Sequence, residues 1–277
     1  MGGKGLPVKT EDIQIRDPYV LPVAAEGVYY LFGTTDKQPW GGKAEGFDAW
    51  RSRDLHHWEG PFPAFRPEPG FWADENFWAP EVHCHSGRYF MFASFKAAGK
   101  CRATQVLVAD RPQGPYRTHG PAPLTPPDWE CLDGTLFIDD AGAPWMVFCH
   151  EWLQMYDGSM DALPLRPDLS GPAGDPVTLF RASEATWAKS FFHDFPKGAG
   201  TVQRQCRVTD GPFLHRTRSG QLLMLWSSQG SQGYAMGLAR SVSGRIQGPW
   251  TQEPEALYAT DGGHGMLFRR FDGGLCL

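Results

Sequence analysis

The chain has 277 residues, with 31 acidic against 26 basic residues and a formal net charge of −5, and it contains 33 glycines and 24 prolines. The absence of basic clusters argues against nucleic-acid and membrane-surface partners, and no apolar run reaches the ~18 residues of a bilayer-spanning helix. Glycine and proline make up about a fifth of the chain and aromatic residues 13%. This composition indicates a turn-rich, all-β globular protein and excludes a disordered segment.

The N-terminal residues Met1-Gly-Gly-Lys-Gly-Leu-Pro7 contain no apolar core of a secretory signal, so a native N-terminus would predict a cytoplasmic protein. Strand-like runs follow, rich in aromatic, β-branched or large apolar residues: Gly27–Gly33, Arg88–Phe95, Pro144–His150 and Gln221–Ser228. Only Ser183–Lys189 has a short helical pattern, and Phe191-Phe192-His193 after it is expected to be a loop. No linker divides the chain, which predicts a single domain over residues 1–277.

A short phrase recurs along the chain: a small or polar residue, then Pro or Gly, then any residue, then an apolar one. It appears as Asp17-Pro-Tyr-Val, Ala79-Pro-Glu-Val, Asp133-Gly-Thr-Leu, Asp210-Gly-Pro-Phe and His264-Gly-Met-Leu. Five such units predict a five-bladed β-propeller, whereas the rival β-sandwich would show no fivefold phrase. The sequence stops one strand after His264, where a complete blade needs about 25–40 further residues. We therefore expect a fifth blade that is incomplete at the C-terminus, or one that residues 1–12 complete.

The first strand of a propeller blade lines the axis, so the opening residues of the five phrases are expected to form a ring: Asp17, Ala79, Asp133, Asp210 and His264. In the alternative interpretation, an Asp before Pro or Gly merely caps a turn. Carboxylates confined together raise one another's pKa. Glycoside hydrolysis needs one protonated carboxyl group as acid and one carboxylate as base or nucleophile. The ring therefore predicts a glycosidase.

The same residues resemble a known family. The segments around these positions are similar to the successive blade motifs of glycoside hydrolase family 43: Ile15-Arg16-Asp17-Pro18, Trp78-Ala79-Pro80-Glu81, Leu132-Asp133-Gly134, Thr209-Asp210-Gly211-Pro212-Phe213 and Gly263-His264-Gly265. The resemblance implies an inverting glycosidase that cleaves α-L-arabinofuranosyl or β-xylosyl linkages in plant-type oligosaccharides or polysaccharides, with β-galactofuranosyl linkages as a further option. It implies Asp17 as the general base, Asp133 as the residue that adjusts the acid's pKa and orients the substrate, and Asp210 as the general acid.

One departure leaves the acid open. The family's acid is usually Glu, and Asp210 has a side chain shorter by one methylene group. Glu151, which closes the strand predicted at 144–150, is the alternative acid; its other interpretation is a rim carboxylate or a partner of a sugar hydroxyl. An alternative function is a non-catalytic, carbohydrate-binding propeller. That alternative is disfavoured because Asp17, Asp133 and Asp210 all remain ionisable.

Sugars offer apolar faces and many hydroxyls, so substrate contacts are expected from Phe77, Trp78, Glu81, Trp152 and His264. The alternatives are core or inter-blade packing for the aromatic residues and a structural acid for Glu81. The long insert over residues 175–207 is expected to wall one side of the pocket. For His264 the resemblance implies a hydrated calcium ion near the axis; no cofactor is required, and no redox or phosphate motif is present.

Cysteine and histidine residues give no further site. His83-Cys84-His85 has the residue types of a metal site, but the two histidines and the cysteine face opposite sides of a strand. The six scattered cysteines are expected to be ordinary buried thiols.

Overall fold

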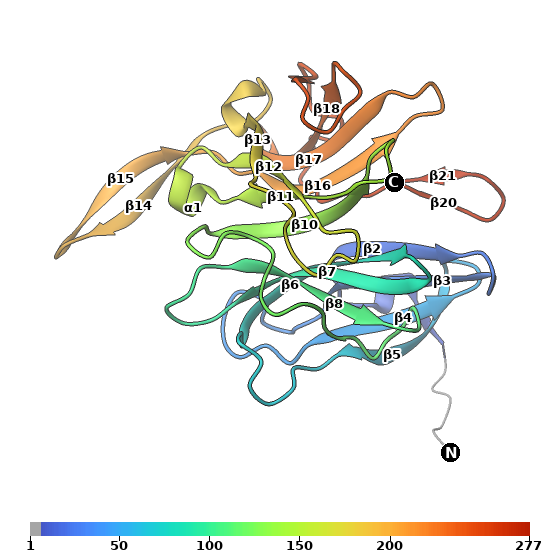
Figure 1. Ribbon diagram of the computed structural model, residues 1–277. Coiled ribbons are helices and arrows are strands. Elements are labelled where there is room, and N and C mark those ends of the chain that lie inside the picture. The colour runs from blue at the N-terminus through green and yellow to red at the C-terminus, as the bar shows by residue number, and fades with distance from the viewer. Residues whose placement is uncertain (1–6) are drawn as a thin grey trace. The chain divides into compact units, whose positions relative to one another are not determined.

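The computed structural model describes residues 7–277, and its regular secondary structure is almost entirely antiparallel strand (Figure 1). The chain divides into two compact units, Met1–Leu124 with Met266–Leu277, and Thr125–Gly265. We call them the first and the second unit. The all-β prediction is confirmed.

The first unit contains three sheets. The first sheet has the strand order β1-β5-β4-β3-β2, with β1 (Val8–Lys9), β2 (Arg16–Val23), β3 (Val28–Thr34), β4 (Phe47–Ser52) and β5 (His57–Phe65). The second runs β6 (Glu75–His85), β7 (Arg88–Lys96), β8 (Ala103–Ala109) and β9 (Arg117–Thr118). The third is the hairpin of β20 (Phe268–Arg269) and β21 (Leu275–Cys276).

The second unit also contains three sheets. One runs β10 (Cys131–Ile138), β11 (Pro144–His150), β12 (Ser159–Pro164) and β13 (Val177–Arg181). Another runs β16 (Asp210–Arg216), β17 (Leu222–Gly230), β18 (Gly233–Ser241) and β19 (Trp250–Gln252). Between them in sequence lies the hairpin of β14 (Phe191–Lys197) and β15 (Gly200–Cys206).

These sheets match the predicted blades. Four sheets with four or more strands follow one another in the chain, each built as an antiparallel meander, which is how propeller blades are made. After His264 the described residues form the two-stranded hairpin β20–β21, which follows the fifth motif in the chain. Residues 7–12 belong to the first sheet instead, where Val8 and Lys9 pair with Trp58 and His57 of β5. Residues 1–6, which the expectation also included, lie outside the described residues.

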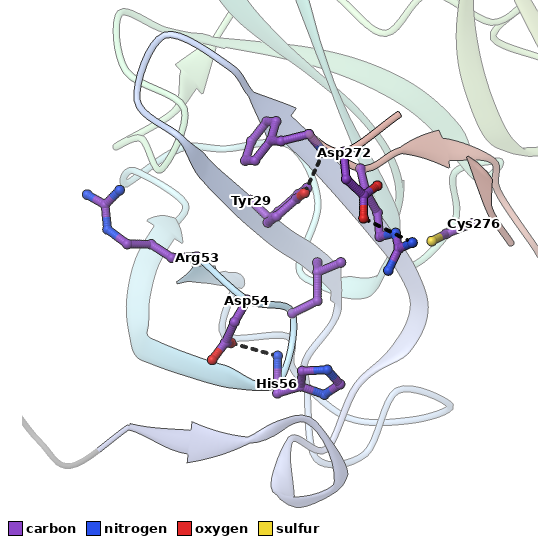
Figure 2. A pocket seen from close by; sticks show the side chains of 9 residues that line it. Tyr29, Arg53, Asp54, His56, Asp272 and Cys276 are labelled. Atoms are coloured by element: carbon purple, nitrogen blue, oxygen red, sulfur yellow. Dashed lines mark hydrogen bonds and ion pairs between the residues drawn. The ribbon is translucent and has the colours of Figure 1, made fainter. Parts of the chain in front are cut away.

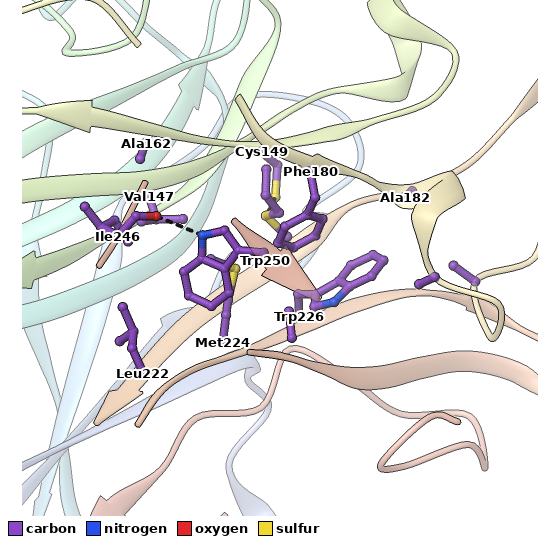
Figure 3. Close-up of a cluster of buried hydrophobic side chains, with 14 of the residues drawn as sticks. Val147, Cys149, Ala162, Phe180, Ala182, Leu222, Met224, Trp226, Ile246 and Trp250 are labelled. Carbon is purple, nitrogen blue, oxygen red and sulfur yellow. Dashed lines mark hydrogen bonds between the residues drawn. The ribbon is translucent and has the colours of Figure 1, made fainter. Parts of the chain in front are cut away.

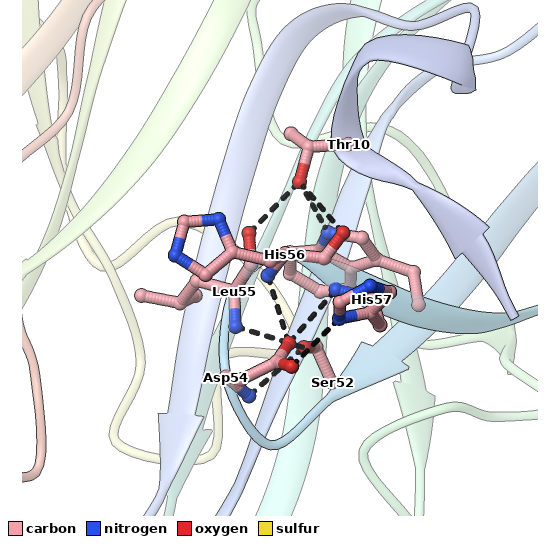
Figure 4. Close-up of polar contacts among 7 residues, drawn as sticks. Thr10, Ser52, Asp54, Leu55, His56 and His57 are labelled. Carbon is pink, nitrogen blue, oxygen red and sulfur yellow. Dashed lines mark hydrogen bonds and ion pairs between the residues drawn. The ribbon is translucent and has the colours of Figure 1, made fainter.

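The N-terminal segment is fixed to the first sheet by a compact set of polar contacts (Figure 4). The hydroxyl of Thr10, in the 3₁₀ turn η1 (Thr10–Asp12), donates to the carbonyl of Leu55 at 2.8 Å and accepts from the indole N–H of Trp58 at 2.9 Å. The carboxylate of Asp54 accepts the backbone N–H groups of His56 and His57, both at 2.8 Å. This Asx-type turn orients the backbone that Thr10 binds.

The insert over residues 175–207 corrects two predictions. Phe191-Phe192-His193 is the start of β14, not a loop, and the helical pattern over Ser183–Lys189 yields only the 3₁₀ turn η2 (Ala182–Glu184). The helix does not continue, because the backbone of Ala185 is already extended, with φ −98° and ψ 123°. Within residues 7–277 the single α-helix is α1 (Trp152–Met155).

Large aromatic side chains fill the core of each unit. In the second unit Trp226 packs against Phe180 and Trp187 with ring centroids 5.3 and 4.6 Å apart (Figure 3). Trp187 fits there because residue 237 is glycine and has no side chain; a Cβ at Gly237 would lie 2.2 Å from the indole ring. In the first unit Phe77 and Phe95 are fully buried, with centroids 4.8 Å apart. Each such buried ring contributes about 1.5–3 kcal/mol to stability, which makes the sheets a stiff support for polar side chains at their ends.

None of the helices described over residues 7–277 is long and apolar enough to cross a membrane.

Candidate active site

The first strand of each four- or five-stranded sheet carries the same bulge, in which two residues oppose one on the next strand. The register shifts lie between Arg16 and Tyr19, Trp78 and Glu81, Leu132 and Thr135, and Asp210 and Phe213. The first bulged residue has a positive φ in every case: Asp17 (50°), Ala79 (46°), Asp133 (57°) and Gly211 (51°). Such bulges redirect side chains at functional sites.

The bulge corrects the register of the fourth motif. Gly211, not Asp210, occupies the position of Asp17 and Asp133, while Asp210 pairs with Ser227 just as Arg16 pairs with Thr34. In the fourth motif the aspartate stands one residue before the position that repeats in the backbone. That position is defined by the left-handed conformation, which Gly adopts most easily. His264, with φ 53°, keeps its predicted ring position. Asp210 therefore lies one residue before the ring position of its sheet.

Asp133 joins the two large sheets of the second unit. Its Oδ2 accepts the backbone N–H of Gly211 at 3.0 Å and lies 3.8 Å from Nδ1 of His264. Gly211 is required at this approach, since a Cβ there would lie 2.7 Å from Cγ of His264. The structure thus brings Asp133, His264 and the residue after Asp210 together.

Asp210 has the properties of a proton donor. The hydroxyl of Tyr234 donates to its Oδ2 at 2.9 Å. Burial, followed by the negative charges of Asp133 and Glu151, raises the pKa of Asp210 to about 8, although the Tyr234 hydrogen bond and His264 act in the opposite direction. A carboxyl group with such a pKa is protonated at neutral pH, as a general acid must be.

Glu151 lies directly after β11 and precedes α1. It is 3% exposed, and its backbone N–H donates to the carbonyl of Glu130 at 2.8 Å. Its charge contributes to the raised pKa of Asp210, so the structure places it in the electrostatic neighbourhood of the predicted acid. It is a buried carboxyl group and not the solvated rim carboxylate of the alternative interpretation.

Asp17 lies in the first unit, on the bulge of β2. Its Oδ2 accepts the hydroxyl proton of Thr34 at 2.9 Å, and Thr34 Oγ1 in turn accepts the backbone N–H of Ala79 at 2.9 Å. Ser227 has the equivalent place in the second unit, where its Oγ accepts the N–H of His264 at 2.7 Å. In the first unit this hydroxyl links β3 to the bulge of β6, whereas in the second unit it binds the backbone of His264, which lies outside the strands.

The predicted sugar contacts differ in their accessibility. Phe77 is fully buried among Phe47, Phe65 and Phe95. Its prediction as a contact is wrong, because strand alternation turns its side chain into the core. Glu81 is also buried, with its Oε2 at 3.2 Å from Nε2 of His83, as expected of a structural acid.

Two tryptophans are only partly covered. The indole N–H of Trp78 donates to the carbonyl of Pro39 at 2.7 Å; its ring lies 5.1 Å from that of the exposed Trp40 and 4.2 Å from the guanidinium of Arg102. Trp152, the first residue of α1, packs its half-buried ring against Phe191 and His193 of β14, with centroids 5.0 and 5.1 Å away. Both remain predicted sugar contacts.

Metal ligands are sparse in the described part of the chain. Over residues 7–277 no three His, Cys, Asp or Glu side chains converge on a common point. Calcium takes six to eight oxygen ligands, whereas Asp133 Oδ2 is the oxygen placed near the His264 ring, at 3.8 Å. These two side chains would leave most of the coordination to water, and the hydrated calcium ion implied for His264 stays a prediction. All six cysteines are free thiols; Cys131, Cys149 and Cys206 are buried as predicted, whereas Cys84 is exposed and Cys101 and Cys276 are only partly buried.

The first unit contains a hollow of about 460 Å³ that is lined by none of the predicted catalytic residues (Figure 2). Its lining includes Tyr29, Asp54, Arg270 and Asp272. Hydrogen bonds from the backbone and ring of His57 hold the pKa of Asp54 well below its usual range, and Asp272 pairs with Arg270 at 3.1 Å. Asp54 is therefore ionised near neutral pH and could not serve as a proton donor there.

Comparisons with known proteins give consistent results. The sequence profile of glycosyl hydrolases family 43 matches residues 7–274. The crystal structure of an endo-arabinase from Bacteroides thetaiotaomicron is 38% identical, with a TM-score of 0.85 over 98% of this chain and 91% of that one. A thermostable family-43 glycoside hydrolase shares the fold, at 23% identity and a TM-score of 0.75 over 94% of this chain and 81% of that one.

A curated protein is also similar. The extracellular exo-α-(1→5)-L-arabinofuranosidase of Cellvibrio japonicus is 26% identical over 179 residues, which are 59% of this chain and 47% of that protein. The match thus spans about half of the length of this curated relative.

Proposed function

The chain belongs to glycosyl hydrolases family 43, and on that premise we propose that it hydrolyses α-L-arabinofuranosyl linkages in plant-type oligosaccharides or polysaccharides, with Asp210 as the general acid. The raised pKa of Asp210, to about 8, is the observation that supports this role. The arabinose preference is supported by the names of two relatives, an endo-arabinase and an exo-α-(1→5)-L-arabinofuranosidase. β-Xylosyl linkages are the second candidate within the family.

The proposed reaction is a single displacement with inversion. Protonated Asp210 gives its proton to the glycosidic oxygen while the bond from that oxygen to the anomeric carbon breaks. A carboxylate takes one proton from a water molecule, and the water oxygen forms the new bond to the anomeric carbon. Asp210 ends as a carboxylate and the base as a carboxylic acid, so a proton must return through solvent before the next cycle.

The base is proposed from the sequence motif. Asp17 is the motif carboxylate of the first unit, and Thr34 binds its Oδ2. This hydrogen bond fixes the position of the carboxylate, which a base that must meet a water molecule requires. Asp133 is proposed to keep Asp210 protonated. Its carboxylate binds the N–H of Gly211, the residue after Asp210, and its negative charge raises the pKa of Asp210.

A panel of 4-nitrophenyl glycosides tests the proposal, with the α-L-arabinofuranoside, β-xyloside and β-galactofuranoside compared on the parent chain and on Asp17→Asn. Release from the arabinofuranoside that Asp17→Asn abolishes, with an inverted first product by NMR, is the expected result. Binding of arabino-oligosaccharides without release from the panel or from arabinan would contradict it and favour the non-catalytic alternative.

A second comparison separates the two candidate acids. Asp210→Asn is expected to lower kcat on arabinobiose by about 10²–10⁴-fold. On a 2,4-dinitrophenyl glycoside, whose leaving group needs no proton, the loss should be much smaller. Glu151→Gln is the matched variant; the same leaving-group dependence in Glu151→Gln, with Asp210→Asn unaffected, would move the acid to Glu151.

A further inference from the structure

We propose that Tyr234 is a positioning residue for the acid: its phenol hydroxyl holds Asp210 Oδ2 and thereby places the transferable proton on Oδ1. The inference rests on the proposed function, in which Asp210 protonates the leaving oxygen. It adds a residue from the third strand of the sheet, 24 positions after Asp210, that no motif of the sequence marks.

The hydrogen bond itself determines which oxygen carries the proton. Tyr234 donates to Oδ2 at 2.9 Å, so Oδ2 must offer a lone pair in that direction. Protonated Asp210 has a single O–H, and a proton on Oδ2 would compete with the tyrosine for the same oxygen. The favoured arrangement has Tyr234 on Oδ2 and the acidic proton on Oδ1, which then faces the leaving group.

The position of Tyr234 is fixed by the backbone around it. Its carbonyl accepts the N–H of Gly262 at 2.8 Å, and its own N–H donates to Oδ1 of Asp261 at 3.2 Å. The backbone at Gly263 lies close to the Tyr234 ring, since a Cβ at Gly263 would lie 2.5 Å from Cε1 of Tyr234. A tyrosine has only two side-chain torsions, so little freedom remains at the hydroxyl.

The groups that act on Asp210 define the expected pH effect. The negative charges of Asp133, on β10, and Glu151, after β11, raise its pKa, whereas His264 and the hydroxyl of Tyr234 lower it. Without the hydroxyl, the pKa of Asp210 rises further and the proton is no longer directed to Oδ1. The acid would remain protonated to higher pH but would deliver its proton less efficiently.

The experiment compares Tyr234→Phe with Tyr258→Phe, a matched control on a tyrosine that is 46% exposed. The substrates are aryl α-L-arabinofuranosides of increasing leaving-group pKa, together with arabinobiose. For Tyr234→Phe we expect kcat/KM to fall about tenfold on the poorest leaving groups, the order of one hydrogen bond. The 2,4-dinitrophenyl substrate should change little, and the alkaline limb of the pH profile should move to higher pH. Tyr258→Phe should match the parent.

Gly263→Ala is the second variant, for the case that Tyr234→Phe does not fold. It keeps the hydroxyl but displaces the ring, and it should show the same leaving-group dependence. An equal loss on all leaving groups in the folded variants, with an unmoved pH limb, would overturn the inference. If Asp210→Asn shows the leaving-group dependence and Tyr234→Phe does not, only the role of Tyr234 fails. If Asp210→Asn lacks it, or the parent is inactive, the proposed function fails and the inference with it.

Discussion

The carboxylate of Asp133 accepts the backbone N–H of Gly211 at 3.0 Å, directly beside the residue proposed to donate the proton. One side chain therefore ties β10 to β16 and also places a negative charge near Asp210. These two effects can be separated, because the amide oxygen of an asparagine can still accept the Gly211 hydrogen bond.

Asp133→Asn should therefore lower the pKa of Asp210, since it removes a like charge and keeps the hydrogen bond. Activity needs the protonated acid, so the alkaline limb of kcat/KM should move to lower pH. Asp140→Asn, at an exposed carboxylate whose partner is Arg216, is the control. An alkaline limb at the parent's pH in Asp133→Asn would remove Asp133 from this role.

Stability should also depend on pH through Asp210. Its folded pKa of about 8 lies above the value of about 3.9 expected in the unfolded chain. Between these values the folded chain holds a proton that the unfolded chain has released, so the free energy of unfolding falls as pH rises. Asp210→Asn lacks this dependence. The Tm of Asp210→Asn minus that of the parent should therefore increase from pH 5 to pH 8, and a constant difference would argue against a protonated Asp210.

Gly211→Ala should destabilise the chain by more than the usual cost of a left-handed alanine, which is about 1–2 kcal/mol. The added Cβ would lie 2.7 Å from Cγ of His264, so the histidine must move. Gly142→Ala is the matched control, because Gly142 also has a positive φ but has no atom within 4 Å of the added carbon. Chemical denaturation measures both, and equal losses would show that the approach of His264 costs nothing.

Phe77→Ala should lower the free energy of unfolding by about 3–5 kcal/mol, because the ring is fully buried. Phe192→Ala, at a ring that is 66% exposed, should change stability by less than about 0.5 kcal/mol. An effect of Phe77→Ala on KM without a loss of stability would restore Phe77 as a sugar contact.

Much of the fold was predictable because the inner blade strands are apolar runs bounded by turn residues. Pro144–His150 has the predicted bounds, and the order of the motifs correctly identified the propeller and the family. The fourth motif was displaced by one residue because backbone conformation, not residue type, is what repeats. Tyr234 was missed because its contact with Asp210 arises from strand pairing, which no local spacing records. The hairpin β14–β15 was missed although Phe191, His193 and Phe195 alternate as a strand does.

The shared bulge has a consequence for how such a protein can change. Four sheets keep the same backbone geometry while the bulged position holds Asp, Ala, Asp or Gly, so the shape of the strand does not depend on the side chain it displays. Ala79 occupies a conformation that aspartate tolerates better than alanine does. A new acidic group could therefore be acquired at that position by single substitution without rebuilding β6, and the scaffold is in this sense open to evolutionary exchange of its reactive groups.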